Sequence, residues 1–411
     1  MVLSFQQARA VVGEHANTLR AAATERVALL AAAGRVLAQP ITADRDLPPF
    51  ARATRDGYAV RAGETVKLPA RLRVAGEIRA GAEPELTAVA LRPGEAIAIM
   101  TGAPLPPGAD AVVMVEHTTA EQQIVEIRRS VAAGENVVPR GAEARAGENL
   151  LSCGARMGPT QIALVAACGQ AEVMVYRRPR VAIVSTGDEV VGIAAQPGPN
   201  QIRNSNSYAL AAQVMRAGGE PVQLPIAPDN AEQLRHLLQQ GLALDLLVIT
   251  GGVSMGRHDL VEPVLTDLGA EFFFTGAEIQ PGRPVVFGRA PHPASSSGHT
   301  YFFGLPGNPI STVVCFELFA RGLVQALAGA APHPLRYVGA QLTAEVRVKR
   351  GLTRFLPALL AGSEARLTVS PVPTQGSGDL AALARANCLL VVEADRERLA
   401  AGETAHVIEI L

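Results

Sequence analysis

The sequence predicts a multidomain protein of the α/β plus β class, and three observations lead to that prediction. The chain has 411 residues, more than one ordinary hydrophobic core usually supports. Compact apolar strands alternate with amphipathic helices between residues 177 and 330, which favours a mainly parallel sheet covered on both faces. Short β-rich runs separated by Gly and Pro turns precede and follow that region.

Four parts are expected along the chain. Residues 1–42 and 145–176 show helical spacing, and we expect them to form one discontinuous helical linker domain. Residues 43–144 indicate a β-rich domain of hairpins, inserted between the two halves of the linker. Residues 177–330 form the predicted α/β domain, and residues 331–411 a small C-terminal β domain.

Three segments are predicted to be helices in the linker domain. "LSFQQARAVVGEHA" (Leu3–Ala16) and "ATERVALLAAAGRVLA" (Ala23–Ala38) carry apolar residues at intervals of three and four. The same spacing returns in "GPTQIALVAACG" (Gly158–Gly169), and we expect this later segment to pack on the first two.

The composition excludes several classes of protein. Hydrophobic residues make up 48% of the chain, which argues for folded cores and against disorder. The net charge of −1 gives no electrostatic reason to expect a nucleic-acid or membrane partner. No secretory signal pattern opens the chain, no apolar window reaches about 18 residues, and the four cysteines form no C-x-x-C pair. We therefore expect a reduced, cytoplasmic protein.

Three glycine-containing loops follow predicted strands of the α/β region. They are "STGDEVV" (Ser185–Val191), "TGGVSMGRHD" (Thr250–Asp259) and "GLPGNPIS" (Gly304–Ser311). In an open α/β sheet, ligands bind at the carboxyl ends of the strands. Because glycine lets backbone N–H groups approach an anion, the three loops together predict a site for a phosphate-bearing ligand.

Acidic residues at strand ends and helix starts have two interpretations. Asp229 and Asp259 occupy positions typical of helix N-caps, and Asp229 with Glu232 fits a capping box. Asp188, Glu189, Asp229 and Asp259 also suit a Mg²⁺ site, because Mg²⁺ takes one or two carboxylates together with substrate phosphates. Both interpretations are compatible.

The segment Gly252–Gly256 matches G-x-S-x-G, the nucleophile elbow of a serine hydrolase, with Ser254 as its serine. An elbow also needs an oxyanion-donor loop upstream, and no His-Gly-Gly run precedes Ser254. The sequence contains neither G-x-x-x-x-G-K-[ST] nor G-x-G-x-x-G. A glycine-rich ligand loop is therefore favoured over a hydrolase, a P-loop enzyme or a dinucleotide-binding protein.

With these loops assembled, the sequence resembles the MoeA family of molybdopterin molybdenumtransferases, to which the E domain of gephyrin is related. Six stretches carry the resemblance in the family's order. They are "RDGYAV" (Arg55–Val60), "IMTGAPLPPGADAVVMVE" (Ile99–Glu116), "STGDEVV", "TGGVSMGRHD", "PGRPVVFG" (Pro281–Gly288) and "GLPGNPISTVVCFE" (Gly304–Glu317).

The resemblance implies an elongated homodimer of four-part subunits with a central MogA-like molybdopterin-binding α/β domain and a barrel-like C-terminal domain. It implies insertion of molybdate into adenylylated molybdopterin, with Mg²⁺ dependence and release of AMP. Contacts with a MogA-type adenylyltransferase and with molybdoenzymes are possible partners. A non-catalytic molybdopterin-binding scaffold or carrier is the alternative.

The resemblance also assigns roles to individual residues. The catalytic positions are Asp56, Thr101, Glu189, Asp229 and Asp259, and the last three are also the expected Mg²⁺ ligands. The first two are expected to face the cleft of the partner subunit. The residues expected to bind the pterin and its phosphate are Gly251, Gly252, Ser254, Arg283, Pro284, Pro306, Gly307, Asn308 and Ser377.

The chain departs from the family pattern at three positions. Glu143 stands where an Asp is usual, which keeps the charge. Gln280 replaces a Lys, while Arg283 keeps a cation that can grip an oxyanion with two N–H groups. Pro357 stands where an Arg is expected, and Arg354 is a candidate to compensate. The departures concern molybdate binding most directly and keep the carrier alternative open.

Overall fold

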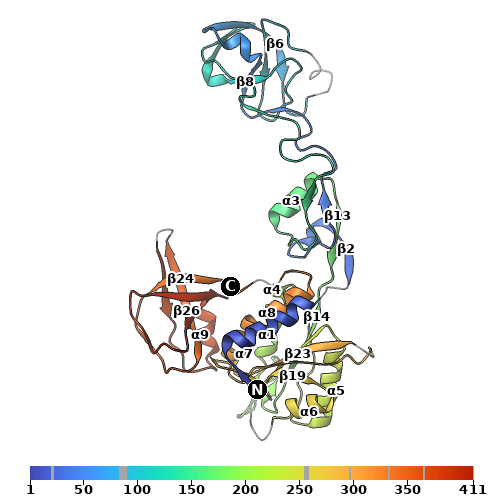
Figure 1. Ribbon diagram of the computed structural model, residues 1–411, viewed down its shortest axis with the longest axis vertical. Coiled ribbons are helices and arrows are strands. Elements are labelled where there is room, and N and C mark those ends of the chain that lie inside the picture. The colour runs from blue at the N-terminus through green and yellow to red at the C-terminus, as the bar shows by residue number, and fades with distance from the viewer. Residues whose placement is uncertain are drawn as a thin grey trace.

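The computed structural model describes residues 1–19, 23–82, 90–253, 259–295, 298–331, 334–363 and 366–410. The molecule is elongated (Figure 1). The β-rich domain lies at one end, a small linker domain follows it, and the α/β domain and the C-terminal barrel lie side by side at the other end. This arrangement agrees with the predicted multidomain α/β plus β class.

The α/β domain is built on a six-stranded sheet with the order β17-β14-β18-β23-β22-β19. Strand β14 pairs in parallel with β17 and β18, and β18 pairs in parallel with β23. Strand β22 is antiparallel to both β23 and β19, so the mainly parallel sheet is confirmed and has an antiparallel edge. The bounds are β14 Arg180–Ser185, β17 Glu220–Gln223, β18 Leu246–Thr250, β19 Glu271–Phe274, β22 Val286–Pro291 and β23 His299–Leu305.

Alternate residues of the central strands face two separate hydrophobic clusters. Val181 and Ile183 of β14 belong to the cluster under α4, α7 and α8, whereas Ala182 and Val184 belong to the cluster under α5 and α6. This alternation with period two is what a strand buried on both faces requires. The helices are α4 Asn206–Ala217, α5 Ala231–Leu242, α6 Val261–Asp267, α7 Pro309–Cys315 and α8 Arg321–Leu327, with a π-helical turn over Phe316–Ala320 between the last two.

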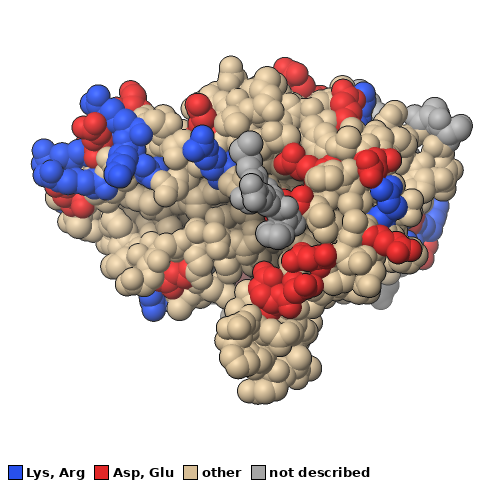
Figure 2. Space-filling view, turned by 90° about the horizontal axis from the view of Figure 1, so that it is seen from below, with Lys and Arg blue, Asp and Glu red and all other residues tan. Residues whose placement is uncertain are grey.

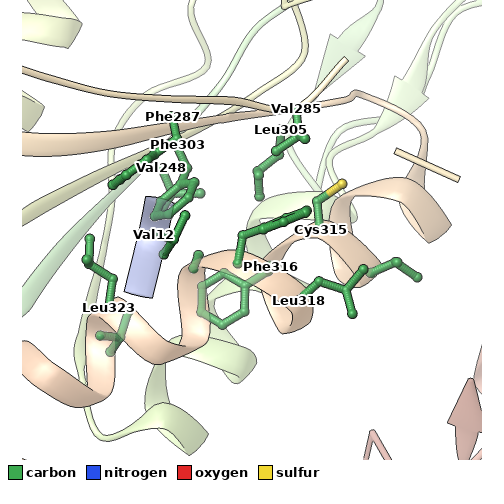
Figure 3. Close-up of a cluster of buried hydrophobic side chains, with 14 of the residues drawn as sticks. Val12, Val248, Val285, Phe287, Phe303, Leu305, Cys315, Phe316, Leu318 and Leu323 are labelled. Atoms are coloured by element: carbon green, nitrogen blue, oxygen red, sulfur yellow. The ribbon is translucent and has the colours of Figure 1, made fainter. Parts of the chain in front are cut away.

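The first helix, α1 (Phe5–Thr18), packs on the α/β domain and not on the linker domain. Ser4 caps it in a capping box with Gln7. Its buried residues lie on one face and join the same cluster as the sheet and α8: Phe5, Ala8, Val12 and Ala16. In Figure 3, Val12 lies among side chains of both the sheet and α8. The expected packing against the segment around residue 160 is therefore wrong, because the larger apolar surface is that of α8 and the sheet.

The second predicted helix is also wrong. Residues Thr24–Ala28 form strand β2, antiparallel to β13 (Glu172–Tyr176), and Leu29–Ala32 form a single 3₁₀ turn. Helical spacing of alanines is a weak local preference, and pairing with a neighbouring strand overrides it. The third predicted helix is present as α3 (Pro159–Ala167). It shares one apolar core with both strands and with Leu37 and Ile41.

The β-rich domain contains a six-stranded sheet with the order β8-β5-β7-β6-β10-β9. Two hydrophobic clusters lie against it, and both consist mainly of Val, Ile and Ala. Its strands are β5 Gly57–Val60, β6 Ala70–Ile78, β7 Glu95–Ile99, β8 Ala111–Met114, β9 Thr118–Glu121 and β10 Ile124–Ile127. The pairs β4–β11 (Arg52–Ala53, Val137–Val138) and β3–β12 (Ile41–Thr42, Asn149–Leu151) run toward the linker domain.

The C-terminal domain is a five-stranded barrel, which β26 closes by pairing with both β27 and β28. Strand β21 (Ile279–Gln280) of the α/β domain adds to β26, and Phe355 of the barrel lies in the α/β hydrophobic cluster. The barrel is therefore fixed against the α/β domain by backbone pairing and a shared core. Its elements are β24 Tyr337–Leu342, β26 Thr353–Ser363, β27 Arg366–Pro371, α9 Leu380–Arg385, β28 Cys388–Val392 and β30 Thr404–Glu409.

One helical stretch, Pro309–Leu327, is long and apolar enough to cross a membrane by composition alone. In the structure 78% of it is buried inside the protein, against the sheet and α1. It is accordingly the core helix of the α/β domain.

We expect Phe5→Ala to destabilise the α/β domain strongly. Phe5 is 4% exposed, and its ring contacts Phe319 of the core helix at 6.1 Å and Phe355 of the barrel at 4.9 Å between centroids. Truncating a buried Phe costs about 3–5 kcal/mol. Thermal unfolding followed by circular dichroism measures the effect. Phe50→Ala, at a residue that is 43% exposed, is the matched control, and equal melting temperatures for the two variants would contradict this packing.

Candidate functional site

The three glycine loops meet at one edge of the α/β sheet. Ser185 of β14 lies opposite Thr250 of β18, which lies opposite Leu305 of β23, so the three strands end at the same level. The loops that follow surround a pocket of about 270 Å³, which we call the acidic pocket. Its lining includes one cation, Arg203, and Ser185, Thr186, Gly187, Glu189, Asn204, Asn206, Asp229, Thr250, Gly251, Gly252, Asp259 and Gly307.

Three of the predicted acids, Glu189, Asp229 and Asp259, lie around this pocket, and Asp229 does not have the capping role expected from the sequence. The side chain of Asn230, not that of Asp229, caps α5 by accepting hydrogen bonds from the N–H groups of Glu232 and Gln233. The N-cap residue of α6 is Leu260, one position after Asp259. Asp and Asn are similarly good caps, so the Asp229–Asn230 pair could not be resolved from sequence. The backbone N–H of Asp229 donates instead to Asp188 at 3.0 Å.

The acidic pocket fits a divalent cation only in part. Glu189, Asp229 and Asp259 line it, but the described residues contain no group of three or more His, Cys, Asp or Glu side chains that could hold a metal ion. Mg²⁺ characteristically uses one or two carboxylates and completes its octahedron with phosphate oxygens and water. The residues present therefore fit a cation that arrives with a phosphate-bearing ligand, and they do not form a complete protein cage.

The Gly251–Gly252 turn runs over Thr186, a residue that sequence reasoning missed. Both glycines have left-handed φ values, 92° and 61°, and a Cβ on either would meet the Thr186 hydroxyl at 2.8 or 2.9 Å. Thr186 is 7% exposed, and its hydroxyl has no hydrogen-bond partner among the residues that the structure describes. A buried hydroxyl in this position can donate to or accept from a polar group of a ligand. Ser254 lies outside the described residues.

Two asparagines at the start of α4 were also missed, and they tie the loops together. Asn204 accepts hydrogen bonds from the Ser185 hydroxyl and from the N–H of Ser207, each at 3.1 Å. Asn206 donates to the Thr250 hydroxyl at 3.0 Å and to the Gly307 carbonyl at 2.7 Å. The repeated Asn-Ser pair just before an apolar helical run was the available signal, because such residues concentrate at helix starts.

A second pocket, of about 970 Å³, lies between the α/β domain and the barrel. We call it the basic pocket, because four cations line it: Arg283 from the α/β domain, and Arg347, Lys349 and Arg354 from the barrel. In Figure 2, Lys and Arg side chains gather over the barrel end of the molecule, whereas Asp and Glu predominate over the α/β domain. The predicted binding residues that this pocket brings together are Arg283, Pro284, Pro306, Asn308 and Ser377.

Two of the family departures fall in the basic pocket. Gln280 and Pro357 both line it, so two positions where the resemblance leads us to expect cations hold uncharged residues. Arg354 lines the same pocket and donates from Nη2 to the Lys349 carbonyl at 2.7 Å. Its Nε is buried and has no partner among the described residues, which leaves a donor for a ligand. Glu143 instead pairs with Arg52 in the β-rich half of the molecule.

The two pockets meet at one loop. Gly307 lines the acidic pocket, whereas its neighbours Pro306 and Asn308 line the basic pocket. The segment Pro306–Asn308 is therefore a common wall between a carboxylate-lined site and a guanidinium-lined site.

Asp56 and Thr101 lie together, but in the β-rich domain at the far end of the molecule (Figure 1). The backbone N–H and the hydroxyl of Thr101 both donate to Asp56 at 2.7 Å. Neither residue is among the described residues that line the two pockets. The structure thus joins the predicted pair and separates it from the pockets of its own chain.

Family models match three consecutive parts of the chain. The MoeA N-terminal region (domain I and II) matches residues 3–169, a probable molybdopterin binding domain matches 182–326, and the MoeA C-terminal region (domain IV) matches 339–410. The α/β domain that carries the glycine loops thus belongs to the molybdopterin-binding class.

Curated relatives and solved structures give the particular family. The molybdopterin molybdenumtransferase of Nostoc sp. is 40% identical over 313 residues, 75% of this chain and 70% of its own. That of Bacillus subtilis is 35% identical over 397 residues, 94% and 90% of the two chains. The molybdopterin biosynthesis moeA protein from Pyrococcus horikoshii OT3 matches with a TM-score of 0.83 at 28% identity, over 100% of both chains. This chain belongs to the MoeA family of molybdopterin molybdenumtransferases, enzymes of molybdenum cofactor biosynthesis, as the six motifs predicted.

We expect Thr101→Val to raise the pKa of Asp56 part of the way toward its ordinary value. Hydrogen bonds from the Thr101 backbone N–H, and then from its hydroxyl, lower the pKa of this carboxyl in the native protein. The associated stabilisation is therefore complete above the unfolded pKa of Asp, and it is lost as the pH falls through the lower native pKa. Valine removes only the hydroxyl donor. Carboxyl ¹³C NMR titration measures the pKa, Thr101→Ser is the control that keeps the donor, and an unchanged pKa in the Val variant would contradict this account.

Proposed function

We propose that this chain inserts molybdate into adenylylated molybdopterin and releases AMP. The observation that carries the proposal is the pair of pockets on either side of Pro306–Asn308, one lined by carboxylates and glycine turns and the other by cations. For this reaction the enzyme must hold a phosphoanhydride and a tetrahedral oxyanion next to each other. Two adjoining sites of opposite charge meet that demand.

The acidic pocket is the proposed site of the phosphoanhydride. Glycines 251 and 252 expose backbone toward it, and the buried Thr186 hydroxyl lies beneath them. The three carboxylates there outnumber the one cation that lines the pocket, Arg203, and would repel bound phosphate, so a divalent cation is needed between the two. Mg²⁺ is proposed in that role, held by one or two of Glu189, Asp229 and Asp259, and it would neutralise phosphate charge when the anhydride bond breaks.

The basic pocket is the proposed site of molybdate. Arg283, in the loop after β21, lines this pocket from the α/β domain, and Arg347, Lys349 and Arg354 line it from the barrel. An arginine can bind two oxygens of an oxyanion at once, and an ammonium adds a second positive charge. Together they supply the positive charge that the uncharged Gln280 and Pro357 do not. The protein's contribution is positioning and charge neutralisation, without a covalent nucleophile.

Molybdate-dependent release of AMP tests this function. Purified protein with adenylylated molybdopterin and Mg²⁺ is expected to release AMP when molybdate is added, and to stop when EDTA removes the cation, because the carboxylates alone cannot neutralise the phosphates. Chromatographic quantification of AMP measures the rate. Binding of the pterin without AMP release would instead support the carrier alternative, which the losses at Gln280 and Pro357 motivate.

Two arginine variants complete that assay. Arg283→Gln is expected to raise the KM for molybdate by about 10-fold or more, as loss of a charged hydrogen-bond donor does. Arg350→Gln is the control, because Arg350 pairs with Glu397 on the barrel and is not among the described residues of the basic pocket. An equal KM in both variants would contradict the proposed molybdate site.

We also propose that the active form is a homodimer in which Asp56 and Thr101 of one subunit approach the acidic pocket of the other. The proposal is supported by their hydrogen-bonded pairing at the end of the molecule far from the pockets (Figure 1). Other expectations are a cytoplasmic location, consistent with four free cysteines, supply of substrate by a MogA-type adenylyltransferase, and delivery to molybdoenzymes.

Subunit mixing tests the dimer. Asp56→Asn and Asp259→Asn are each expected to lose most AMP-release activity, because each removes a carboxylate of the composite site. Mixed dimers of the two variants carry one intact site, so about a quarter of wild-type activity per subunit should return if half of the dimers are mixed. The assay is AMP release after co-refolding or co-expression. Failure of mixing to restore activity, with dimers verified by light scattering, would show that Asp56 acts elsewhere.

A further inference from the structure

The carbonyl groups of the common wall are held by a chain of side-chain hydrogen bonds. The Thr312 hydroxyl donates to the Pro306 carbonyl at 2.6 Å, and Thr250 lies 3.3 Å from the same hydroxyl. Asn206 donates to Thr250 at 3.0 Å and to the Gly307 carbonyl at 2.7 Å. Thr312 is fully buried and Thr250 is 2% exposed, so these two members are shielded from water, whereas Asn206 is half-buried at the acidic pocket.

The direction of the hydrogen bonds follows from the number of protons. The single proton of Thr312 goes to the Pro306 carbonyl, which is its shortest contact. Thr250 accepts from the amide of Asn206, and its own proton is directed to the Thr312 oxygen at 3.3 Å, with the Pro306 carbonyl at 3.5 Å as a more distant second acceptor. The chain thus runs from Asn206 through Thr250 and Thr312 to Pro306. Because Asn206 also donates to Gly307, both ends of the chain fasten consecutive carbonyls of one loop.

A substitution at Thr312 tests the positioning of the wall without removing a residue that lines a pocket. Thr250 and Asn206 both line the acidic pocket, whereas Thr312 is not among the described residues that line either pocket. It lies in the first turn of the core helix, where its hydroxyl also lies 3.1 Å from the Asn308 carbonyl. Removing that hydroxyl would take away the shortest hydrogen bond of the Pro306 carbonyl, leave only the 3.5 Å contact with Thr250, and loosen the wall on its basic side.

We propose that Thr312 is a positioning residue that couples the two pockets, so that nucleotide phosphate bound in the acidic pocket tightens the binding of an oxyanion in the basic pocket. The inference rests on the proposed function for the identity of the two ligands. A wall fastened at adjacent carbonyls moves as one unit. A ligand that orders Gly307 from one side therefore also orders Pro306 and Asn308 on the other, and the second ligand loses less conformational entropy.

Calorimetric titrations of the full-length protein test the coupling. Molybdate is titrated in the presence of Mg²⁺, with and without saturating AMP. In the wild type we expect AMP to lower the Kd for molybdate by ~5-fold or more, and molybdate to lower the Kd for AMP by the same factor, as linkage requires. Thr312→Val should reduce this factor to about one while each ligand still binds alone. Thr312→Ser, which keeps the hydroxyl, should restore it.

Thr300→Val is the matched control for loss of a buried hydroxyl. Thr300 is 2% exposed, lies at the other end of β23, and donates to the Leu242 carbonyl at 2.7 Å. It is expected to lower the melting temperature as Thr312→Val does and to leave the coupling factor at its wild-type value. A wild-type factor near one, or an undiminished factor in Thr312→Val, overturns the inference while the proposed function stands. Failure of the wild type to bind AMP or molybdate at all overturns the proposed function, and the inference with it.

Discussion

The parallel pairing of β14, β18 and β23 is the constraint on which the site depends. Ser185, Thr250 and Leu305 lie side by side in this pairing, so the chain leaves the sheet three times at the same level. Backbone hydrogen bonds and two buried faces fix that register, and a slip of one residue would turn every apolar side chain to the wrong face. The register of the three strands is therefore sufficient to bring the glycine loops together.

The charges of the two pockets come from different domains. The α/β domain supplies the three carboxylates of the acidic pocket, whereas the barrel supplies three of the four cations of the basic pocket. Neither domain alone forms both pockets, so the site depends on the relative position of the two domains as well as on the fold of each. Pairing of β21 with β26, and burial of Phe355 in the α/β core, set that position with backbone hydrogen bonds and apolar contact together.

The features that could be predicted from the sequence are those that depend on residues close together in the chain. The strands around Val181 and Leu247 were predictable because they are short apolar runs, and the loops because glycine follows each strand. Strand β2 was not, since its neighbour β13 lies almost 150 residues away in sequence and supplies the hydrogen bonds. Likewise, Lys349 joins Arg283 only through the docking of the barrel, which no spacing in the sequence encodes.

The composition of the common wall explains why side chains must hold it. Proline stands at positions 306 and 309, and proline has no backbone N–H, so the loop has few donors of its own while its carbonyls still need partners. Gly307 brings the loop close to Gly251, where an added Cβ would lie 3.5 Å from the Gly251 Cα. Close approach and missing donors together require hydroxyl and amide groups from neighbouring elements. A threonine inside the apolar core helix and an asparagine at the start of α4 meet that requirement, although in sequence they look like ordinary helix residues.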